Sequence, residues 1–160
     1  MIDKTDLAQI QNIISPMLNH KAWGVYLGLE SFVILEFGSP ITHLTKKNSV
    51  VHGEWHVWVY DCAWRLEKGN EVIGGSSDPR EHLTDAVKIM NDLMLQPVVL
   101  TPPSLETTFF FEQEVSLHLF PVSTQDRDAD QRRLYLPDGK VLVIGPGSSW
   151  SHEDASKPRP

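Results

Sequence analysis

Residues 52–64, HGEWHVWVYDCAW, hold the side chains of this sequence that are best suited to chemistry. His52, Glu54 and His56 recur at every second position, so they share one face if the segment is a β-strand. Two imidazoles and a carboxylate on one face could hold a divalent metal ion such as zinc. A metal-dependent enzyme that uses these three residues is therefore one hypothesis.

Strand geometry argues against this metal site. The helical His-Glu-x-x-His motif gathers its ligands through the four-residue step of a helix, and the spacing here lacks that step. Three ligands on one short pleated strand are poorly placed to reach a single ion. We predict instead that His52 and Glu54 are polar residues at the start of a strand and that His56 packs beside Trp58. We assign no metal and no cofactor.

Cys62 is the single cysteine of the chain, so it can form neither an intramolecular disulfide nor a multi-cysteine zinc site. A catalytic thiol needs a neighbouring base and a lowered pKa. Because Cys62 lies between Asp61 and Ala63 in an apolar strand, we predict a small buried filler. No Gly-x-Ser-x-Gly motif occurs. We assign no catalytic residue and predict that the protein is not an enzyme.

The tryptophans provide a further alternative, which is a binding module for a small ligand. Trp23, Trp55 and Trp58 could line a pocket, because ligand sites are commonly walled by aromatic side chains. Aromatic residues on a strand also form the wall of a hydrophobic interior. We favour the interior wall for this tryptophan-rich segment.

The charge of the chain favours a protein partner. The 160 residues include 14 basic and 21 acidic side chains, a net charge of −7, which argues against binding to nucleic acid or to an anionic membrane. The run STQDRDADQRR lacks the glycine and the closing glutamate of a calcium loop. We predict a solvated loop, with Asp126, Asp128 and Asp130 as candidate contacts for a basic partner.

The sequence also predicts a location. Its first residues lack the basic stretch and apolar run of a signal peptide, and no apolar run reaches the ~18 residues of a membrane span. A single cysteine gives no dependence on an oxidising compartment. We therefore expect a cytoplasmic protein that does not associate with membranes.

Two helices are expected to support the strands. The first ends near Ile14, and Asp3 or Thr5 is its N-cap. The second is an amphipathic helix over residues 79–95 with Asp78 as its N-cap.

The remaining sequence is rich in strands. The Asp138-Gly139 pair between two apolar runs predicts a β-hairpin. We predict an α+β fold with a largely antiparallel sheet that both helices cover on one side. A single domain is expected over residues 1–147 and a flexible tail over residues 148–160. The expected strands are residues 22–28, 31–37, 54–66, 71–76, 97–101, 107–113, 114–122, 132–136 and 140–145.

Two stretches, GEWHVWVYDCAWRLEKGNEVIGGSSDPR and LYLPDGKVLVIGPGSSW, resemble a family of small uncharacterised bacterial proteins. That family is similar to the immunity proteins of polymorphic toxin and contact-dependent inhibition systems, and the resemblance spans most of residues 22–150. Immunity proteins of this kind are non-catalytic and block the active site of a toxin domain made by a neighbouring cell. The resemblance implies a cytoplasmic protein that neutralises a partner protein, such as a basic toxin domain, and it implies no catalytic residue.

Overall fold

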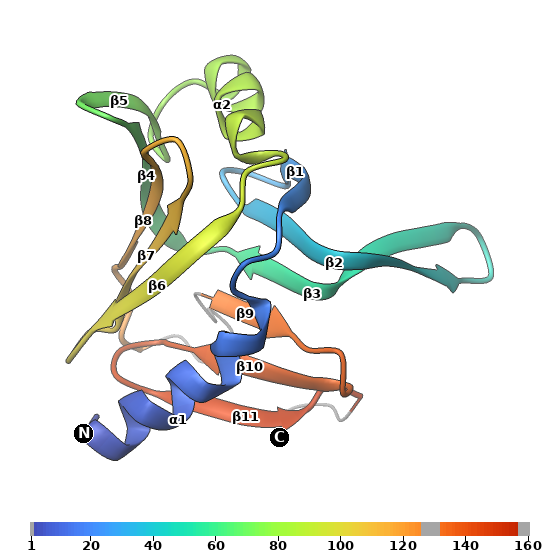
Figure 1. Cartoon of the computed structure of the whole chain (residues 1–160), viewed down its shortest axis with the longest axis vertical. Coiled ribbons are helices and arrows are strands. Elements are labelled where there is room, and N and C mark those ends of the chain that lie inside the picture. The colour runs from blue at the N-terminus through green and yellow to red at the C-terminus, as the bar shows by residue number, and fades with distance from the viewer. Residues whose placement is uncertain (1, 126–131, 157–160) are drawn as a thin grey trace.

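A computed structural model of the whole chain describes residues 2–125 and 132–156. Within these ranges the chain forms two antiparallel β-sheets and two α-helices (Figure 1). This confirms the predicted α+β class and its antiparallel pairing. The strands are divided between two sheets, where the sequence had predicted one.

The strands have the following order within each sheet. The six-stranded sheet runs β1 (Ala22–Leu27), β2 (Val33–Leu44), β3 (Ser49–Val59), β9 (Arg132–Tyr135), β10 (Lys140–Ile144) and β11 (Trp150–Asp154). The five-stranded sheet runs β5 (Glu71–Gly75), β4 (Cys62–Lys68), β8 (Val115–Pro121), β7 (Glu106–Phe111) and β6 (Leu95–Thr101).

A single hydrophobic core lies between the inner faces of the two sheets. On β3 the alternate residues Trp55, Val57 and Val59 are buried in this core. Phe37 of β2 stacks on Phe111 of β7, with ring centroids 6.5 Å apart, and so joins the two sheets. The other face of β3 points away from the core and is free to carry polar side chains.

Helix α1 (Lys4–Ile14) closes one side of the space between the sheets. Asp3 is its N-cap and forms a capping box with Asp6, which confirms one of the two predicted caps. The Gln11 side chain donates to the Val98 carbonyl of β6 over 3.1 Å, and the Trp150 indole of β11 donates to Asp6 over 3.1 Å. The helix therefore joins the edge strands β6 and β11, and the 3₁₀-helix η1 (Ser15–Met17) follows it.

Helix α2 (Arg80–Ala86) closes the opposite side. Arg80 donates to the Leu27 carbonyl of β1 over 3.2 Å, and His82 Nε2 lies 2.8 Å from the Ile73 carbonyl oxygen of β5. The two helices therefore seal different edges of the two sheets, and the prediction that they cover one side of a single sheet was wrong. No helix in the described ranges has the length and apolar character needed to cross a membrane.

The second helix is shorter than the predicted span of residues 79–95. The 3₁₀-helix η2 (Val87–Met90) follows α2, and the chain then hydrogen-bonds to β1, with the Asn91 side chain accepting from the Val25 amide over 2.9 Å. These contacts with β1 replace the last turns of the helix. Asp78 is not the N-cap, because its carboxylate accepts from the Gly75 amide over 2.9 Å.

The predicted strand over residues 54–66 is divided at Tyr60 and Asp61. Asp61 has a φ of 50°, so the chain leaves β3 and enters β4 in the other sheet. The buried positions change phase at this point, from Val57 and Val59 to Cys62. In a single uninterrupted strand Cys62 would point away from the face that carries Val57 and Val59, so the break is needed for all three side chains to be buried.

The C-terminal part of the described chain is more ordered than predicted. The Asp138-Gly139 hairpin is confirmed, since β9 pairs with β10 in antiparallel register and Gly139 has a φ of +81°. Residues 150–154 were expected in a flexible tail but form β11, which pairs along the whole of β10. The prediction of a flexible tail was wrong for this stretch.

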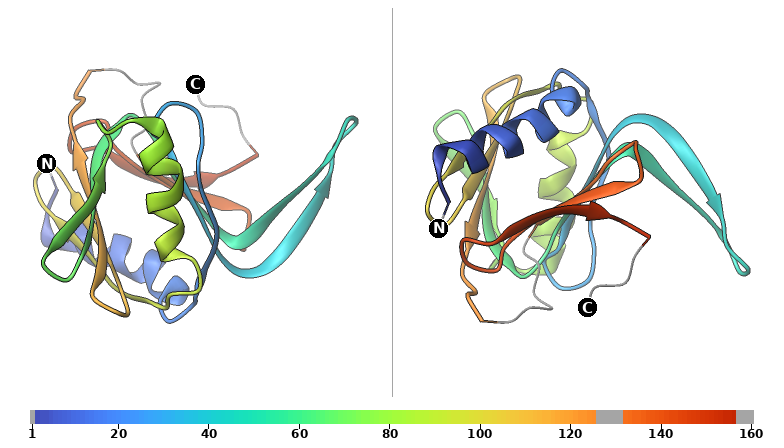
Figure 2. Two further views of the ribbon diagram at one scale, coloured as in Figure 1. Left: turned by 90° about the horizontal axis from the view of Figure 1, so that it is seen from above. Right: turned by 90° about the horizontal axis from the view of Figure 1, so that it is seen from below.

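A long hairpin projects from the body of the molecule. Strand β1 pairs with β2 only as far as Phe37, so residues 38–52 of β2, the turn and β3 extend beyond the sheet (Figures 1 and 2). We call residues 38–52 the arm. It carries His43 and His52.

Candidate functional site

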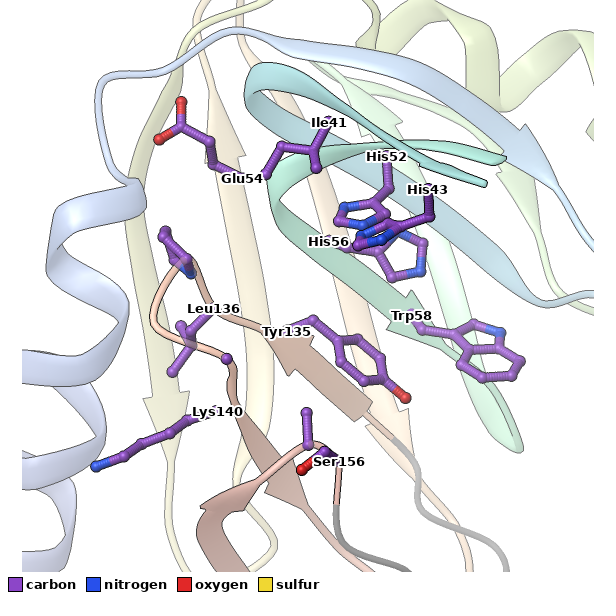
Figure 3. Close-up of a pocket in the computed structure, with 13 residues that line it drawn as sticks. Ile41, His43, His52, Glu54, His56, Trp58, Tyr135, Leu136, Lys140 and Ser156 are labelled. Atoms are coloured by element: carbon purple, nitrogen blue, oxygen red, sulfur yellow. The ribbon is translucent and has the colours of Figure 1, made fainter. Parts of the chain in front are cut away.

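A cavity of about 580 Å³ opens on the outer face of the six-stranded sheet, where the arm leaves the body. Its volume falls within the range of about 300–1,000 Å³ that is usual for small-molecule sites. Figure 3 shows three imidazoles close together in its wall, with an indole and a phenol beside them. We call this space the histidine cavity, and its principal residues are His43, His52, His56, Trp58 and Tyr135.

Strand register brings these side chains onto one face. Glu36 of β2 pairs with His56 of β3, and His56 pairs with Tyr135 of β9. Because side chains at directly paired positions point to the same side of a sheet, the three residues form a row across three strands. His43 and His52 come from the two strands of the arm, with ring centroids 4.5 Å apart and planes 19° apart.

Glu36 holds His56 in place. Its side chain is 5% exposed, and its Oε1 forms a short hydrogen bond with Nδ1 of His56. Its Oε2 accepts the backbone N–H of Gly53 over 2.7 Å. Both carboxylate oxygens are therefore engaged, and neither faces the histidine cavity as a free acceptor.

The backbone around Glu36 is shaped by a β-bulge between Phe37 and Pro40. Gly53 packs so closely that a Cβ on it would lie 2.3 Å from the Phe37 carbonyl oxygen. Only glycine fits there, and its close approach directs its N–H at Glu36. On the other side of the bulge, Glu54 accepts the Ser39 amide over 2.7 Å.

The arrangement around His56 is suited to proton transfer. A carboxylate that accepts from Nδ1–H fixes the imidazole tautomer and leaves a lone pair on Nε2. Within the described chain, Nε2 of His56 has no hydrogen-bond partner, and the side chain is 23% exposed at the cavity wall. Such a nitrogen can accept a proton or a hydrogen bond from a bound molecule.

A second histidine–carboxylate pair provides a contrast. His118 Nε2 lies 2.8 Å from Glu67, and its Nδ1 lies 3.1 Å from the Thr108 hydroxyl. Both ring nitrogens are engaged by the protein. His118 is thus a structural group on the five-stranded sheet, and it is a useful control for His56.

The alternative metal trio is not assembled. His52 and His56 line the cavity, but the carboxylate of Glu54 binds the Ser39 amide and points away from the imidazoles (Figure 3). Across residues 2–125 and 132–156, no group of three histidine, cysteine or acidic side chains is placed to hold a metal ion. The simpler prediction for His56 also needs correction, because its main contact is Glu36 and not Trp58.

The predicted tryptophan pocket does not form as a unit. Trp58 lines the histidine cavity, whereas Trp55 belongs to the hydrophobic core and is 9% exposed. The indole N–H of Trp23 donates to the Gly38 carbonyl over 2.8 Å. The prediction of an interior wall is confirmed for Trp55 and Trp64 but was wrong for Trp58.

The other predicted residues do not contribute to this site. Cys62 is a buried filler, as predicted, and burial raises the pKa of its thiol to about 11. The candidate partner contacts Asp126, Asp128 and Asp130 lie outside the described residues.

Sequence reasoning missed Glu36, His43 and Tyr135. Glu36 did give a signal, since it is the one acid in the apolar run FVILEF of an expected central strand. A carboxylate on a strand with two buried faces must find partners for its charge. His43 and Tyr135 gave none, because their proximity depends on strand pairings between distant segments.

Comparisons of the chain with protein-family models, with curated proteins and with solved structures found no match. The resemblance to immunity proteins therefore stays a prediction.

Proposed function

We propose that the protein binds a small organic molecule in the histidine cavity and that Nε2 of His56 accepts a proton or a hydrogen bond from it. The observation that supports this most directly is that a buried carboxylate, Glu36, is hydrogen-bonded to His56. A buried carboxylate is expensive to desolvate, and a well-packed apolar side chain commonly gives equal or greater stability. Here both oxygens of Glu36 orient His56 and the adjoining Gly53 backbone at the wall of a cavity.

The walls of the cavity indicate the shape of the ligand. The stacked imidazoles of His43 and His52 form a flat surface, and the Tyr135 ring lies 5.6 Å from the His56 ring. Flat aromatic walls favour a planar ligand through offset stacking. The preferred ligand is therefore planar and carries an acidic O–H or N–H group, as in a phenol, an imide or a carboxylic acid.

Binding of p-nitrophenol tests this directly, because its visible absorbance reports whether the phenol is ionised. Titration with protein should shift the absorbance towards the phenolate or its hydrogen-bonded form. The His56→Asn variant should bind at least about tenfold more weakly, since it loses an acceptor worth about 1.4 kcal/mol or more. The matched His118→Asn variant should bind like the wild type, because His118 lies on the other sheet.

A panel of planar phenols, imides and carboxylic acids extends the test by calorimetry. Repeating the titration in buffers of different ionisation enthalpy measures the protons exchanged on binding. Proton exchange in the wild type and none in His56→Asn supports the proposal. Absence of binding across the panel, or equal binding by the His56→Asn variant, would rule it out.

A second proposal is that the protein is a non-catalytic, immunity-type protein that neutralises a partner protein in the cytoplasm. The arm favours this role, because Leu44 is 87% exposed, Val50 50% and Val51 52%. Exposed aliphatic side chains on a projecting element are typical of a contact surface. Lys46 and Lys47 at its turn would contact acidic groups of the partner, while the net charge of −7 on the whole chain would favour the approach of a basic partner such as a toxin domain.

The product of the gene adjacent to this one provides the test. A Leu44→Asp variant should weaken the complex by at least tenfold, because a buried carboxylate would meet the apolar partner surface. Val72→Asp is the matched control, since Val72 is 64% exposed on β5 of the five-stranded sheet, whereas the arm belongs to the six-stranded sheet. Equal weakening by both variants, or an intact complex with Leu44→Asp, would refute a contact through the arm.

A further inference from the structure

His52 presents a second hydrogen-bond acceptor in the wall of the histidine cavity. Its Nδ1 lies 2.7 Å from the Gly53 carbonyl oxygen. Because a carbonyl oxygen can only accept, the proton is on Nδ1, and the neutral ring has its lone pair on Nε2. None of the described residues forms a hydrogen bond with that nitrogen. His43 stacks on the His52 ring, but stacking covers a face of the ring and leaves the in-plane lone pair of Nε2 available.

One residue and one carboxylate fix the tautomers of both His52 and His56. Gly53 accepts from His52 through its carbonyl oxygen and donates its N–H to Glu36 over 2.7 Å. Glu36 in turn accepts from Nδ1 of His56. Both imidazoles therefore use their Nδ1–H within the protein and keep Nε2 as an acceptor.

The two acceptors are close enough to serve one ligand. The rings of His52 and His56 line the same cavity, with centroids 5.9 Å apart and planes tilted by 59° (Figure 3). Since each hydrogen bond to an imidazole nitrogen spans about 2.8 Å, two donors on neighbouring positions of one planar ring can reach both nitrogens. A metal ion would need further ligands, and the described part of the chain has no third histidine, cysteine or acidic group placed to supply one.

We propose that the ligand carries two hydrogen-bond donors on neighbouring positions of a planar ring, one for Nε2 of His56 and one for Nε2 of His52. This specificity rests on the binding function proposed above and narrows the ligand to the chemistry of a catechol, a benzene ring with two adjacent hydroxyl groups. A simple phenol excludes water from both nitrogens but offers a donor to only one of them. An acceptor that loses water without gaining a partner weakens binding.

Calorimetric titration with catechol and with phenol at pH 7 tests this. Both ligands are then un-ionised, because phenolic groups ionise near a pH of about 10. Oxygen-free buffer with EDTA prevents catechol from oxidising or from chelating a trace metal ion. The wild type should bind catechol at least about fivefold more tightly than phenol, which is the effect of one additional hydrogen bond.

The His52→Asn variant should reduce the ratio of the two Kd values to about one. Asparagine keeps a donor for the Gly53 carbonyl but has no atom at the position of Nε2. Loss of the flat imidazole surface weakens both ligands alike, so the ratio isolates the second hydrogen bond. The matched His118→Asn variant, on the other sheet, should keep the ratio of the wild type.

Long-range ¹H–¹⁵N NMR of the wild type provides a measurement that needs no variant. In the free protein the proton of His52 should be on Nδ1, and catechol should shift the Nε2 resonances of both His52 and His56. A proton on Nε2 of His52, equal Kd values for catechol and phenol, or an unchanged ratio in His52→Asn would overturn the two-donor specificity. In these cases phenol binding that depends on His56 would leave the proposed binding function intact, whereas failure of both ligands to bind would remove that function and the specificity with it.

Discussion

Replacement of Glu36 separates its two roles, which are to stabilise the fold and to orient His56. Alanine would remove both acceptors and leave the Gly53 N–H and the His56 Nδ1–H unpaired. A buried donor without a partner costs about 1–3 kcal/mol. Because the His56 side chain is 23% exposed and can reach water, we expect Glu36→Ala to lower the free energy of unfolding by about 2–4 kcal/mol.

Glutamine has nearly the same shape and should cost less, about 1–2 kcal/mol. Its carbonyl oxygen can accept the Gly53 N–H, and its amide group then donates to Nδ1 of His56. That donation requires Nδ1 to be unprotonated, so the neutral imidazole must carry its proton on Nε2. Glu36→Gln should therefore turn the cavity-facing nitrogen of His56 from an acceptor into a donor.

Urea unfolding measures the change in the free energy of unfolding, and long-range ¹H–¹⁵N NMR shows which ring nitrogen of His56 carries the proton. The matched control is Glu54→Gln, because Glu54 accepts the Ser39 amide on the opposite side of the bulge and does not contact His56. This control should change the unfolding free energy by less than about 1 kcal/mol and leave the His56 tautomer unchanged. An unchanged tautomer in Glu36→Gln, or a loss in Glu36→Ala no greater than in Glu54→Ala, would refute the reasoning.

Three further predictions concern packing, thiol reactivity and pH. Gly53→Ala places a Cβ 2.3 Å from the Phe37 carbonyl oxygen, so urea unfolding should show that the free energy of unfolding falls by about 2–3 kcal/mol. An unchanged free energy of unfolding would contradict the close packing at Gly53. Cys62 should react with a disulfide reagent at pH 8 only when the protein unfolds, because a thiol pKa of about 11 leaves only about one thousandth of the molecules as the reactive thiolate. Rapid reaction of the native protein would contradict the burial of Cys62. For Asp6, a hydrogen bond from the Asp3 backbone N–H is the main cause of a pKa below the ordinary 3.8. A folded-state pKa below the unfolded value gives stability that is present above 3.8 and is lost as the pH falls through the lowered value. Acid titration of the unfolding free energy should therefore show a smaller loss for Asp6→Asn than for the wild type, and equal losses would show that Asp6 does not contribute.

Features that depend on neighbours in sequence were predictable. The cap at Asp3 and the hairpin at Asp138 and Gly139 follow from the local chemistry of caps and turns. The alternation along β3 correctly placed His52 and His56 on one face of the strand. Each of these features requires information from only a few consecutive residues.

Features set by distant segments were not predictable. The division of the strands into two sheets depends on the positive φ of Asp61, which no turn motif in DCAW announces. The helical segment stops after η2, at Met90, where Asn91 binds the Val25 amide of β1. In both places tertiary contacts override a periodic pattern that would otherwise continue.

The partner of His56 shows the same limit at the site itself. Glu36 meets His56 only because the β2–β3 register pairs the two positions, and a slip of one residue would place Leu35 or Phe37 there. The register depends on the turn of the arm and on the bulge after Phe37, neither of which has a strong sequence signature. The apolar run FVILEF contained the necessary acid but did not indicate which histidine it would bind.

Glu36 and Arg132 lie on opposite faces of the six-stranded sheet, so the two buried charges cannot neutralise each other. A fold that needed only stability would gain nothing from either, because apolar residues of similar volume serve as well in such positions. The two charges instead have separate contacts. Glu36 orients His56 at the histidine cavity, and Arg132 donates to the Leu105 carbonyl and the Thr107 hydroxyl across the core. The ligand proposed for the histidine cavity would account for the burial of Glu36, whereas Arg132 serves to join the two sheets.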